Sequence, residues 1–562
     1  MSSQNLSLPH YSEFYQNFNR QDFDKHFVGD FSGQINPAIE CCDRYAHTDK
    51  IALYWEGLDG QSEEVSFKKL KEETAKVANF LVAQGVKPGD FVAGLLPRTP
   101  QLLYTIIGAW KAGAIYQPLF TAFGPKAIEQ RLQTSKAKVI ITDHINRPKL
   151  EEVKFPRTDG VKVVLSRDEN AQKYQGDFDY AKDISQQSSE FEPVARSGED
   201  LMMMLSTSGT TGLPKGVPVP IHALTSFKIY MDYAVDLREE DRFWNLADPG
   251  WAYGLYYSVT GPLINGNSLL FNEAGFTAED TYRVIKKYKI TNLAGSPTAF
   301  RLLIGAGEEL AQEIKGQLRR VSSAGEALNP EVIRWFREEL GTVICDHYGQ
   351  TELGMVVNNH HSLDHTKKAG SMGFPMPGYK MAVVDENGQE VAPNTPGELA
   401  VDIANSSVLW FKGYYQKETD SIRKGYYHTH DTAEMNEEGL FTYVGRSDDV
   451  ITSSGYRIGP FDVESALVEH PAVVESAVVG IPDEKRTEIV KAYIVLNPKT
   501  LKEIGTMEEE QQKKFKEDLK EEISLFVKKS LAAHAYPRII EFLDQLPKTP
   551  SGKIQRYLLR SK

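Results

Sequence analysis

Helix-like and strand-like segments alternate through about the first 440 residues, and this alternation constrains the fold more than any other feature. Apolar side chains recur at helical spacing along residues 67–84, and a short apolar run at 91–96 follows them. Residues 100–112 and 125–135 repeat the pattern, each before another short apolar run. Because parallel strands need long crossovers, this order predicts an α/β fold with mostly parallel sheets covered by helices.

The pattern changes twice towards the C-terminus. From about residue 373, short strands separated by Gly, Pro, Asn and Asp turns predict a β-rich lobe. After about residue 448, a hairpin at 450–458, further strands and a charged helix at 507–530 predict a small α+β domain. The Glu and Lys residues of that helix are typical of a solvated face.

Composition excludes several classes of protein. With 64 basic and 77 acidic residues, the formal charge is −13, so general binding of nucleic acid is not expected. Three cysteines among 562 residues exclude a disulfide framework. The N-terminus resembles neither a signal nor a transit peptide, and no apolar run is long enough to span a membrane. We therefore expect a cytoplasmic protein that does not bind membranes.

The strongest local signal is LMMMLSTSGTTGLPKGV at residues 201–217, an apolar run followed by hydroxyls, glycines and a lysine. Glycines let backbone N–H groups turn towards an anion, and Lys215 adds charge. The segment is not a Walker-type loop, because Pro214 stands where that motif requires glycine. Composition alone favours a phosphate-binding loop and an ordinary Ser/Thr/Gly loop about equally.

Seven further motifs follow in order: DPGW at 248–251, SAGEA at 323–327, YGQTE at 348–352, THD at 429–431, GRSDD at 445–449, SGYR at 454–457 and PKTPSGK at 547–553. Together with STSGTTGLPKG, this set resembles the adenylate-forming (acyl-activating) enzyme superfamily. The resemblance covers the chain from about residue 20 to its end. Through DPGWAYG, YGQTE and SSGYRIGPFDVESAL, it is nearest to medium-chain acyl-CoA synthetases.

The resemblance implies a two-step reaction. A carboxylate attacks the α-phosphorus of ATP to give acyl-AMP and pyrophosphate, and the thiol of coenzyme A then displaces AMP. ATP, Mg²⁺ and coenzyme A are the implied cofactors, and a small-molecule carboxylic acid is the implied substrate. The resemblance also implies an ATP- and acyl-binding domain over residues 1–446, a hinge at 447–448 around Asp448, and a mobile C-terminal domain over 449–562.

The same resemblance assigns the nucleotide site. Glu352 would hold Mg²⁺ and Thr351 would donate to the α-phosphate, while Asp431 would bind the ribose hydroxyls. His430 departs from the family, which commonly has glycine there; we expect its side chain to point outward rather than to crowd the ribose. The full set of ATP- and AMP-binding residues is Thr207, Ser208, Gly209, Thr210, Thr211, Gly212, Lys215, Gly325, Glu326, Ala327, Tyr348, Gly349, Gln350, Asp431, Arg446 and Arg457.

The C-terminal domain would serve both steps. Lys553 would stabilise the negative charge of the adenylation transition state, and its acetylation would block that step, which implies a lysine acetyltransferase and deacetylase as partners. Rotation at Asp448 would then withdraw Lys553 and bring the hairpin at 454–460 to the site. The residues expected to bind coenzyme A are Ser454, Gly455, Tyr456, Arg486, Lys528 and Tyr536, with Arg457 nearby.

The acyl pocket is expected at Trp251 and Gly349. Acetate- and propionate-activating relatives usually have tryptophan at the position of Gly349, so glycine would leave space for a short- or medium-chain, branched or aromatic acid. Acetate and propionate stay open if other side chains refill the pocket, and the sequence fixes neither the acid nor the oligomeric state.

Three other functions are compatible with parts of this pattern. An adenylating enzyme that loads a carrier protein is disfavoured by SSGYRIGPFDVESAL, and nothing positive supports a luciferase-like oxygenase. A nucleotide sensor would be expected to lack some of Glu352, Asp431, Arg457 and Lys553, which are all present. His360, His361 and His365 have metal-like spacing, but a loop position favours a structural role.

Overall fold

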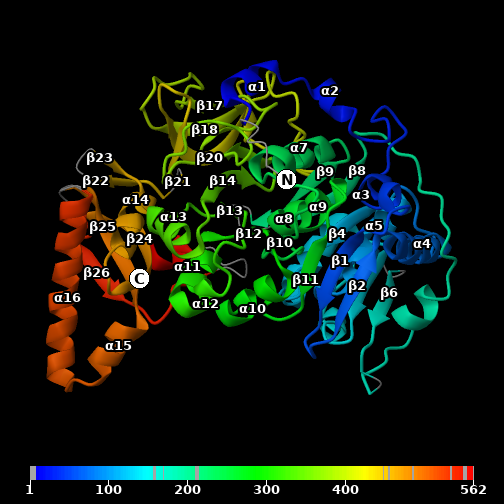
Figure 1. Ribbon diagram of the computed structural model, residues 1–562, viewed down its shortest axis with the longest axis horizontal. Coiled ribbons are helices and arrows are strands. Elements are labelled where there is room, and N and C mark those ends of the chain that lie inside the picture. The colour runs from blue at the N-terminus through cyan, green and yellow to red at the C-terminus, as the bar shows by residue number, and fades with distance from the viewer. Residues whose placement is uncertain are drawn as a thin grey trace, which may run out of the picture.

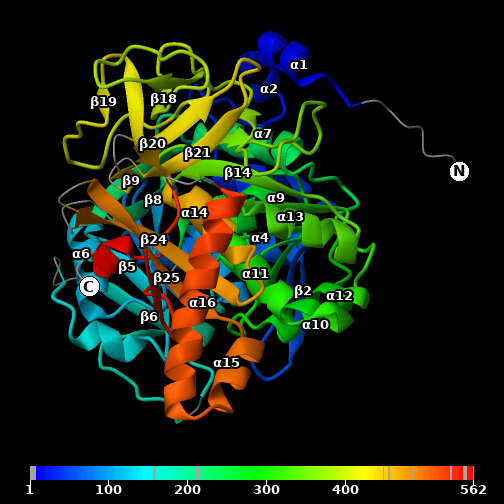
Figure 2. The same cartoon turned by 90° about the vertical axis from the view of Figure 1, so that its left-hand side faces the viewer.

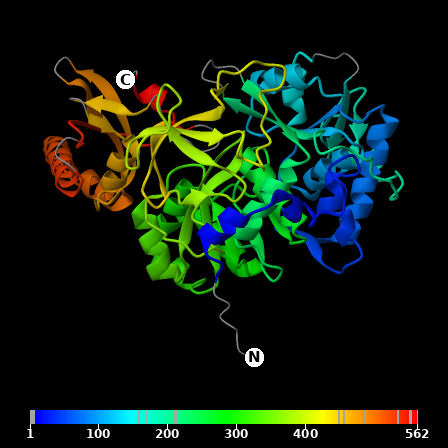
Figure 3. The ribbon, with the colours of Figure 1, turned by 90° about the horizontal axis from the view of Figure 1, so that it is seen from above.

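The computed structural model describes residues 8–155, 160–168, 170–208, 214–446, 449–453, 456–483, 486–531, 535–548 and 554–560. Three neighbouring bodies follow one another along the molecule, from the blue N-terminal part through the green and yellow part to the orange C-terminal part (Figure 3). The expected α/β class with a β-rich lobe and a C-terminal α+β region is confirmed.

A seven-stranded sheet forms the first body, in the order β7-β6-β5-β3-β4-β8-β9. Its strands are parallel except for β9, which returns antiparallel to β8. Helix α4 (Phe67–Ala83) precedes β3, while α5 (Pro100–Lys111) and α6 (Pro125–Ser135) connect β3 to β4 and β4 to β5, all close to the expected bounds. The strands are β3 (Phe91–Leu95), β4 (Ile115–Pro118), β5 (Val139–Asp143), β6 (Val161–Leu165), β7 (Phe178–Asp179), β8 (Leu201–Ser208) and β9 (Pro214–Pro220).

A six-stranded sheet forms the second body, in the order β10-β12-β13-β14-β15-β16. It is parallel as far as β14, and β15 and β16 are antiparallel additions. Its strands are β10 (Phe243–Asn245), β12 (Asn292–Gly295), β13 (Arg320–Ala324), β14 (Ile344–Gln350), β15 (Gly354–Asn358) and β16 (Phe374–Pro375). Its helices are α10 (Ala278–Tyr288), α11 (Pro297–Gly305), α12 (Glu308–Gln312) and α13 (Pro330–Trp335), which continues as a π-helix to Leu340.

A smaller sheet in the order β11-β1-β2 uses strands that are far apart in sequence: β1 (Ile51–Glu56), β2 (Ser62–Ser66) and β11 (Leu269–Asn272). The other α-helices described in the N-terminal part are α1 (Tyr11–Asn17), α2 (Arg20–Asp24), α3 (Pro37–Cys41), α7 (Ala223–Ile229), α8 (Ala252–Gly254) and α9 (Gly261–Ile264). In the described part of the chain, no helix combines the length and apolar character needed to cross a membrane.

The β-rich lobe is an antiparallel sheet in the order β17-β18-β20-β19, and β21 also pairs with β20, farther along that strand than β19. It lies beside β14 at the top of Figure 1. Its strands are β17 (Met381–Val384), β18 (Gly397–Asp402), β19 (Ile422–Arg423), β20 (Tyr426–Met435) and β21 (Phe441–Arg446).

The C-terminal region has its own sheet, in the order β23-β22-β25-β24 with β26 on β25, and its own apolar core. The long helix α16 covers the outer side of this sheet (Figure 2). The elements are β22 (Ile451–Ser453), β23 (Tyr456–Ile458), α14 (Pro460–Val468), β24 (Val473–Asp483), β25 (Thr487–Leu496), α15 (Pro498–Gly505), α16 (Glu509–Ser530), β26 (Ile539–Phe542) and α17 (Arg556–Arg560).

Candidate active site

Four side chains from three separate motifs meet between the end of β14 and the β-rich lobe. Asp431 on β20 is buried, and its Oδ2 accepts hydrogen bonds from the Tyr348 hydroxyl and, at 2.8 Å, from Gln350 Nε2. Arg446, paired with Asp431 across β20 and β21, brings Nη1 to 3.5 Å from Oδ1. Burial and the neighbouring Asp431 carboxylate raise the pKa of Tyr348, so its hydroxyl stays protonated and donates.

His430, the residue that departs from the family pattern, points away from this group. Its backbone φ is +60°, in the left-handed region that favours glycine. Its Nε2 lies 3.0 Å from Ser421 Oγ and its Nδ1 lies 3.4 Å from a Glu398 oxygen. Since the side chain is 42% exposed and has partners different from those of Asp431, the expected outward orientation is confirmed.

The turn that carries Glu352 is fixed by three tyrosine hydroxyls. Tyr256 donates to the Thr351 carbonyl at 2.9 Å, and Tyr379 donates to the Leu353 carbonyl at 2.9 Å. Tyr414 donates to Oε1 of Glu352 at 2.8 Å, and Glu352 itself is buried. The turn between β14 and β15 thus holds a carboxylate in a defined place beside Asp431's strand. The sequence analysis missed all three tyrosines.

The expected phosphate-binding segment joins β8 to β9. Thr207 at the end of β8 pairs in register with Lys215 on β9, whose Nζ lies 4.7 Å from the centroid of the Tyr414 ring. Tyr414 therefore contacts both the segment that carries Lys215 and the carboxylate of Glu352. The expected residues Gly209, Thr210, Thr211 and Gly212 lie outside the described residues, as does the side chain of Ser208.

The residues expected to frame the adenine follow β13, another parallel strand. Gly325 has φ +97°, which only glycine adopts readily, and Glu326 and Ala327 come next. Glu326 Oε2 accepts a hydrogen bond from Thr298 Oγ1 at 2.9 Å, so its carboxylate faces α11. Ligands of open α/β sheets bind beyond the carboxyl ends of parallel strands, and β8, β13 and β14 all end at these motifs.

Trp251 lies in an aromatic cluster. Its ring is 5.4 Å from Phe120 and 5.5 Å from Phe123, and the Arg131 guanidinium lies 3.9 Å from the Phe123 centroid. The two phenylalanines are candidate pocket residues that the sequence analysis missed, although both stand in the segment LFTAF directly after β4. This cluster offers an apolar wall next to the DPGW motif.

Gly349 is closely packed against the next strand. A Cβ added there would lie 2.1 Å from the Gly354 carbonyl oxygen and 2.7 Å from Met355 Cα. A larger residue at this position therefore requires the β14–β15 turn to shift. The assignment of Gly349 to the acyl pocket stays a prediction, and Gly349→Trp would perturb the turn as well as any pocket.

Of the residues expected to bind coenzyme A, the structure describes only some. Tyr536 lies under two cations: Lys528 Nζ is 5.0 Å and the Arg538 guanidinium 4.8 Å from its ring, and Arg538 also donates to its hydroxyl at 2.8 Å. Arg538 was missed by the sequence analysis. The backbone N–H of Arg486 donates to Asp483 at 2.8 Å. Asp448, Ser454, Gly455 and Lys553 lie outside the described residues, as do the side chains of Tyr456 and Arg457.

In the histidine-rich segment at 360–365, His360 and His361 make contacts inside the protein core. His360 Nε2 contacts the Pro375 carbonyl at 3.3 Å, and His361 contacts the Val321 carbonyl at 3.0 Å and Cys345 Sγ at 3.5 Å. Within the described ranges, no group of three or more His, Cys, Asp or Glu side chains is arranged to hold a metal. The structural interpretation of these histidines is therefore the one that their contacts support.

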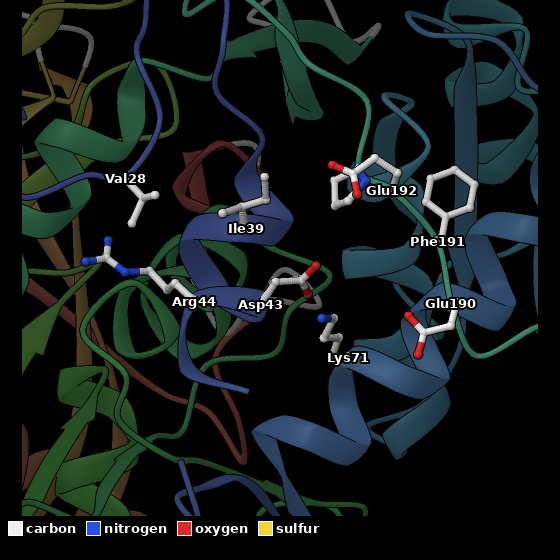
Figure 4. A pocket seen from close by; sticks show the side chains of 9 residues that line it. Val28, Ile39, Asp43, Arg44, Lys71, Glu190, Phe191 and Glu192 are labelled. Carbon is white, nitrogen blue, oxygen red and sulfur yellow. The ribbon is translucent and has the colours of Figure 1, made fainter. Parts of the chain in front are cut away.

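Two surface hollows lie elsewhere. The larger, of about 530 Å³, is bordered by Ile39 and Arg44 on one side and by Glu190, Phe191 and Glu192 on the other (Figure 4). The other, of about 320 Å³, is lined by polar groups such as Lys50 and Asn265. None of the candidate nucleotide-site residues that the structure describes lines either hollow.

Comparison with known proteins shows which protein family the chain belongs to. Residues 42–415 match the family model described as AMP-binding enzyme, and residues 462–553 match the AMP-binding enzyme C-terminal domain. The chain belongs to the family of AMP-binding enzymes, and within it is an adenylate-forming protein similar to acyl-CoA synthetases.

The similarity extends over whole chains. The chain is 39% identical to acetyl-coenzyme A synthetase of Bacillus subtilis, covering 99% of this chain and 95% of the relative. It is 56% identical to a Brucella canis acyl-CoA synthetase of known structure, with a TM-score of 0.79 and 99% of both chains covered. An anthranilate CoA ligase in complex with anthranoyl-AMP has 26% identity and a TM-score of 0.84, with 97% of this chain and 98% of that chain covered.

Proposed function

We propose that this protein is an AMP-forming acid–CoA ligase that converts a carboxylic acid, ATP and coenzyme A into an acyl-CoA, AMP and pyrophosphate. The observation that carries the proposal is the convergence of Tyr348, Gln350, Asp431 and Arg446 beside the turn of Glu352, in a member of the AMP-binding enzymes. Motifs at three separate places in the sequence supply this group.

Each side chain has a role in the nucleotide half of the reaction. The Asp431 carboxylate would accept hydrogen bonds from the ribose hydroxyls, oriented by Tyr348 and Gln350. Lys215 would add positive charge beside the phosphates, and the Thr351 hydroxyl would donate to the α-phosphate. Lys553 would stabilise the charge that develops as the carboxylate attacks.

The buried Glu352 carboxylate fits Mg²⁺, which favours oxygen ligands and commonly uses one or two carboxylates plus substrate phosphates. Bound Mg²⁺ would neutralise phosphate charge. The protein's own contribution is to hold that carboxylate at a turn fixed by Tyr256, Tyr379 and Tyr414.

The bond changes balance over the two steps. A carboxylate oxygen bonds to the α-phosphorus, and the bond from that phosphorus to the pyrophosphate oxygen breaks. The sulfur of coenzyme A then bonds to the acyl carbon, the carbon–oxygen bond to AMP breaks, and the thiol proton is released. Tyr536, Lys528 and Arg538 would bind coenzyme A, together with Ser454, Gly455, Tyr456, Arg457 and Arg486.

The acid would lie against Trp251, Phe120 and Phe123, an apolar wall that suits short- or medium-chain, branched or aromatic acids. The named relatives include an acetyl-coenzyme A synthetase and an anthranilate CoA ligase, so they support ligation to coenzyme A without agreeing on the acid.

A panel of acids tests the proposal. The purified protein is incubated with ATP, Mg²⁺ and acids from acetate to octanoate, benzoate and branched acids, with and without coenzyme A. We expect pyrophosphate with at least one acid, and AMP release that depends on coenzyme A. Pyrophosphate without that dependence would favour a carrier-loading enzyme, and no product from any acid would contradict the proposal.

A further inference from the structure

Tyr414 lies between two parts of the nucleotide site that are far apart in sequence. Its hydroxyl donates to Glu352 Oε1 at 2.8 Å, and its ring faces Lys215 Nζ at 4.7 Å from the centroid. One side chain thus contacts the carboxylate expected to bind Mg²⁺ and the lysine expected to face the phosphates. None of the eight motifs of the sequence analysis includes Tyr414.

The backbone next to Tyr414 is hydrogen-bonded to β9, the strand that carries Lys215. The N–H of the next residue, Tyr415, donates to the Gly216 carbonyl at 2.8 Å, next to Lys215 on β9. Tyr414 itself forms an isolated bridge with Lys417. The Phe411 ring packs at 5.2 Å from the Tyr414 ring. These contacts fix the ring and therefore the direction of the hydroxyl.

The Tyr414 hydroxyl is the donor in its hydrogen bond with Glu352. A carboxylate can only accept a hydrogen bond, so the phenolic hydroxyl 2.8 Å from Glu352 Oε1 must donate it. A hydrogen bond from a fixed donor restricts the rotation of the Glu352 side chain, and a carboxylate held in one orientation loses less freedom when it binds a cation.

We infer that Tyr414 is a positioning residue that orients Glu352 for Mg²⁺. Its ring also couples this carboxylate to strand β9 through Lys215. This inference rests on the proposed function, because it takes Glu352 as the Mg²⁺ ligand. It implies that the hydroxyl and the ring have separable effects: the hydroxyl acts on Mg²⁺, and the ring acts on the phosphates.

Three variants separate these effects. Tyr414→Phe removes the hydroxyl and keeps the ring, and Tyr414→Leu removes both. Tyr426→Phe is the matched control, because the Tyr426 hydroxyl also donates to a glutamate, Glu390, at 3.2 Å but in an exposed part of the lobe. The affinity for ATP is measured by calorimetry in EDTA and in saturating Mg²⁺. The Mg²⁺ activation constant is measured by acid-dependent ATP–pyrophosphate exchange.

For Tyr414→Phe we expect the Mg²⁺ activation constant to rise about tenfold, the effect of one lost hydrogen bond to a charged group. Its affinity for ATP in EDTA should stay within about twofold of the wild type, since the ring still faces Lys215. Tyr414→Leu should in addition weaken ATP binding in EDTA, by about fivefold for a lost cation–π contact. Tyr426→Phe should match the wild type in every measurement.

A double-mutant comparison tests whether Tyr414 acts through Glu352. In a Glu352→Gln background, Tyr414→Phe should change the affinity for ATP in Mg²⁺ less than twofold. The inference is overturned if Tyr414→Phe keeps the wild-type Mg²⁺ dependence, or if it weakens ATP binding equally in EDTA and in Mg²⁺. A wild-type protein without any exchange activity would instead count against the proposed function.

Discussion

At the scale of single residues, His430 shows how the chain tolerates a departure from its family. The residue adopts φ +60°, which costs a non-glycine residue about 1–2 kcal/mol, and its ring is directed to Ser421 and Glu398. We expect His430→Gly to leave the KM for ATP within about twofold, because the imidazole does not share the partners of Asp431. Steady-state kinetics check this, with Asp431→Ala as the positive control. A tenfold change for His430→Gly would mean that the ring reaches the nucleotide.

A second prediction for a single residue concerns the role of Lys553 in adenylation. Lys553 lies outside the described part of the chain. Removing its charge by Lys553→Gln, which mimics acetylation, should lower acid-dependent pyrophosphate exchange by about 100-fold or more, the scale of one lost electrostatic contact to a transition state. The second half-reaction should survive, as measured by the conversion of synthetic acyl-AMP and coenzyme A to acyl-CoA. Wild-type exchange by this variant would refute the assignment, and Lys548→Gln is a control in the same segment.

At the scale of elements, residues on either side of 447–448 are tied to different parts of the molecule. Arg446 contacts Asp431 in the β-rich lobe, whereas the Asp449 carboxylate pairs with Arg556 and Arg560 on α17. Arg556 also binds Glu464 on α14 at 2.8 Å, so the segment just after Lys553 is anchored in the C-terminal region. A rotation between Arg446 and Asp449 would therefore carry Lys553 with it.

This arrangement predicts the effect of making the backbone between Arg446 and Asp449 more rigid. Asp448→Pro fixes one backbone dihedral and should change the ratio of acyl-CoA turnover to pyrophosphate exchange by about tenfold or more, because only one of the two steps suits a single domain orientation. Asp448→Ala, which removes the side chain but leaves the backbone free, should keep the ratio near that of the wild type. Equal ratios in both variants would argue against a hinge here.

The local sequence pattern predicts most of the helices and strands. It does not predict which strands pair with one another. The helix expected at 125–135 is α6 with the same bounds; Pro125 marks its start in the sequence, and in the structure it ends at the left-handed Lys136. The pairing of β1 with β11, more than 200 residues away, has no local signature. The same holds at the site: motifs indicated Glu352 and Asp431, but Tyr256, Tyr379 and Tyr414 reach the turn through contacts distant in sequence.

At the scale of the whole molecule, buried neutral histidines should make the fold sensitive to acid. Burial, with help from Arg320, lowers the pKa of His361 to about 3, and partial burial lowers that of the half-buried His365 to about 4. Burial also depresses the pKa of His347 and His360. In the unfolded chain these groups bind protons below about pH 6.5, so the stability present above that pH is lost as the pH falls towards the native values.

Each such histidine should remove about 1.4 kcal/mol from the free energy of unfolding between pH 7.5 and 5.5. Denaturant unfolding at both pH values measures this loss, and His361→Asn should reduce it by that amount whatever its effect on absolute stability. The exposed His47, as His47→Asn, is the control and should keep the wild-type loss. An unchanged loss in His361→Asn would show that its ring is protonated in the native state.

The central claim is that the acid is activated as an acyl-adenylate, and isotope transfer tests it most directly. An acid from the panel that gives turnover is labelled with ¹⁸O in both carboxylate oxygens, and the products with ATP, Mg²⁺ and coenzyme A are analysed by mass spectrometry. The attacking oxygen stays on phosphorus when the thiol displaces AMP, so we predict one ¹⁸O in AMP and none in pyrophosphate. AMP without ¹⁸O, or label in a phosphate or pyrophosphate product, would contradict the account.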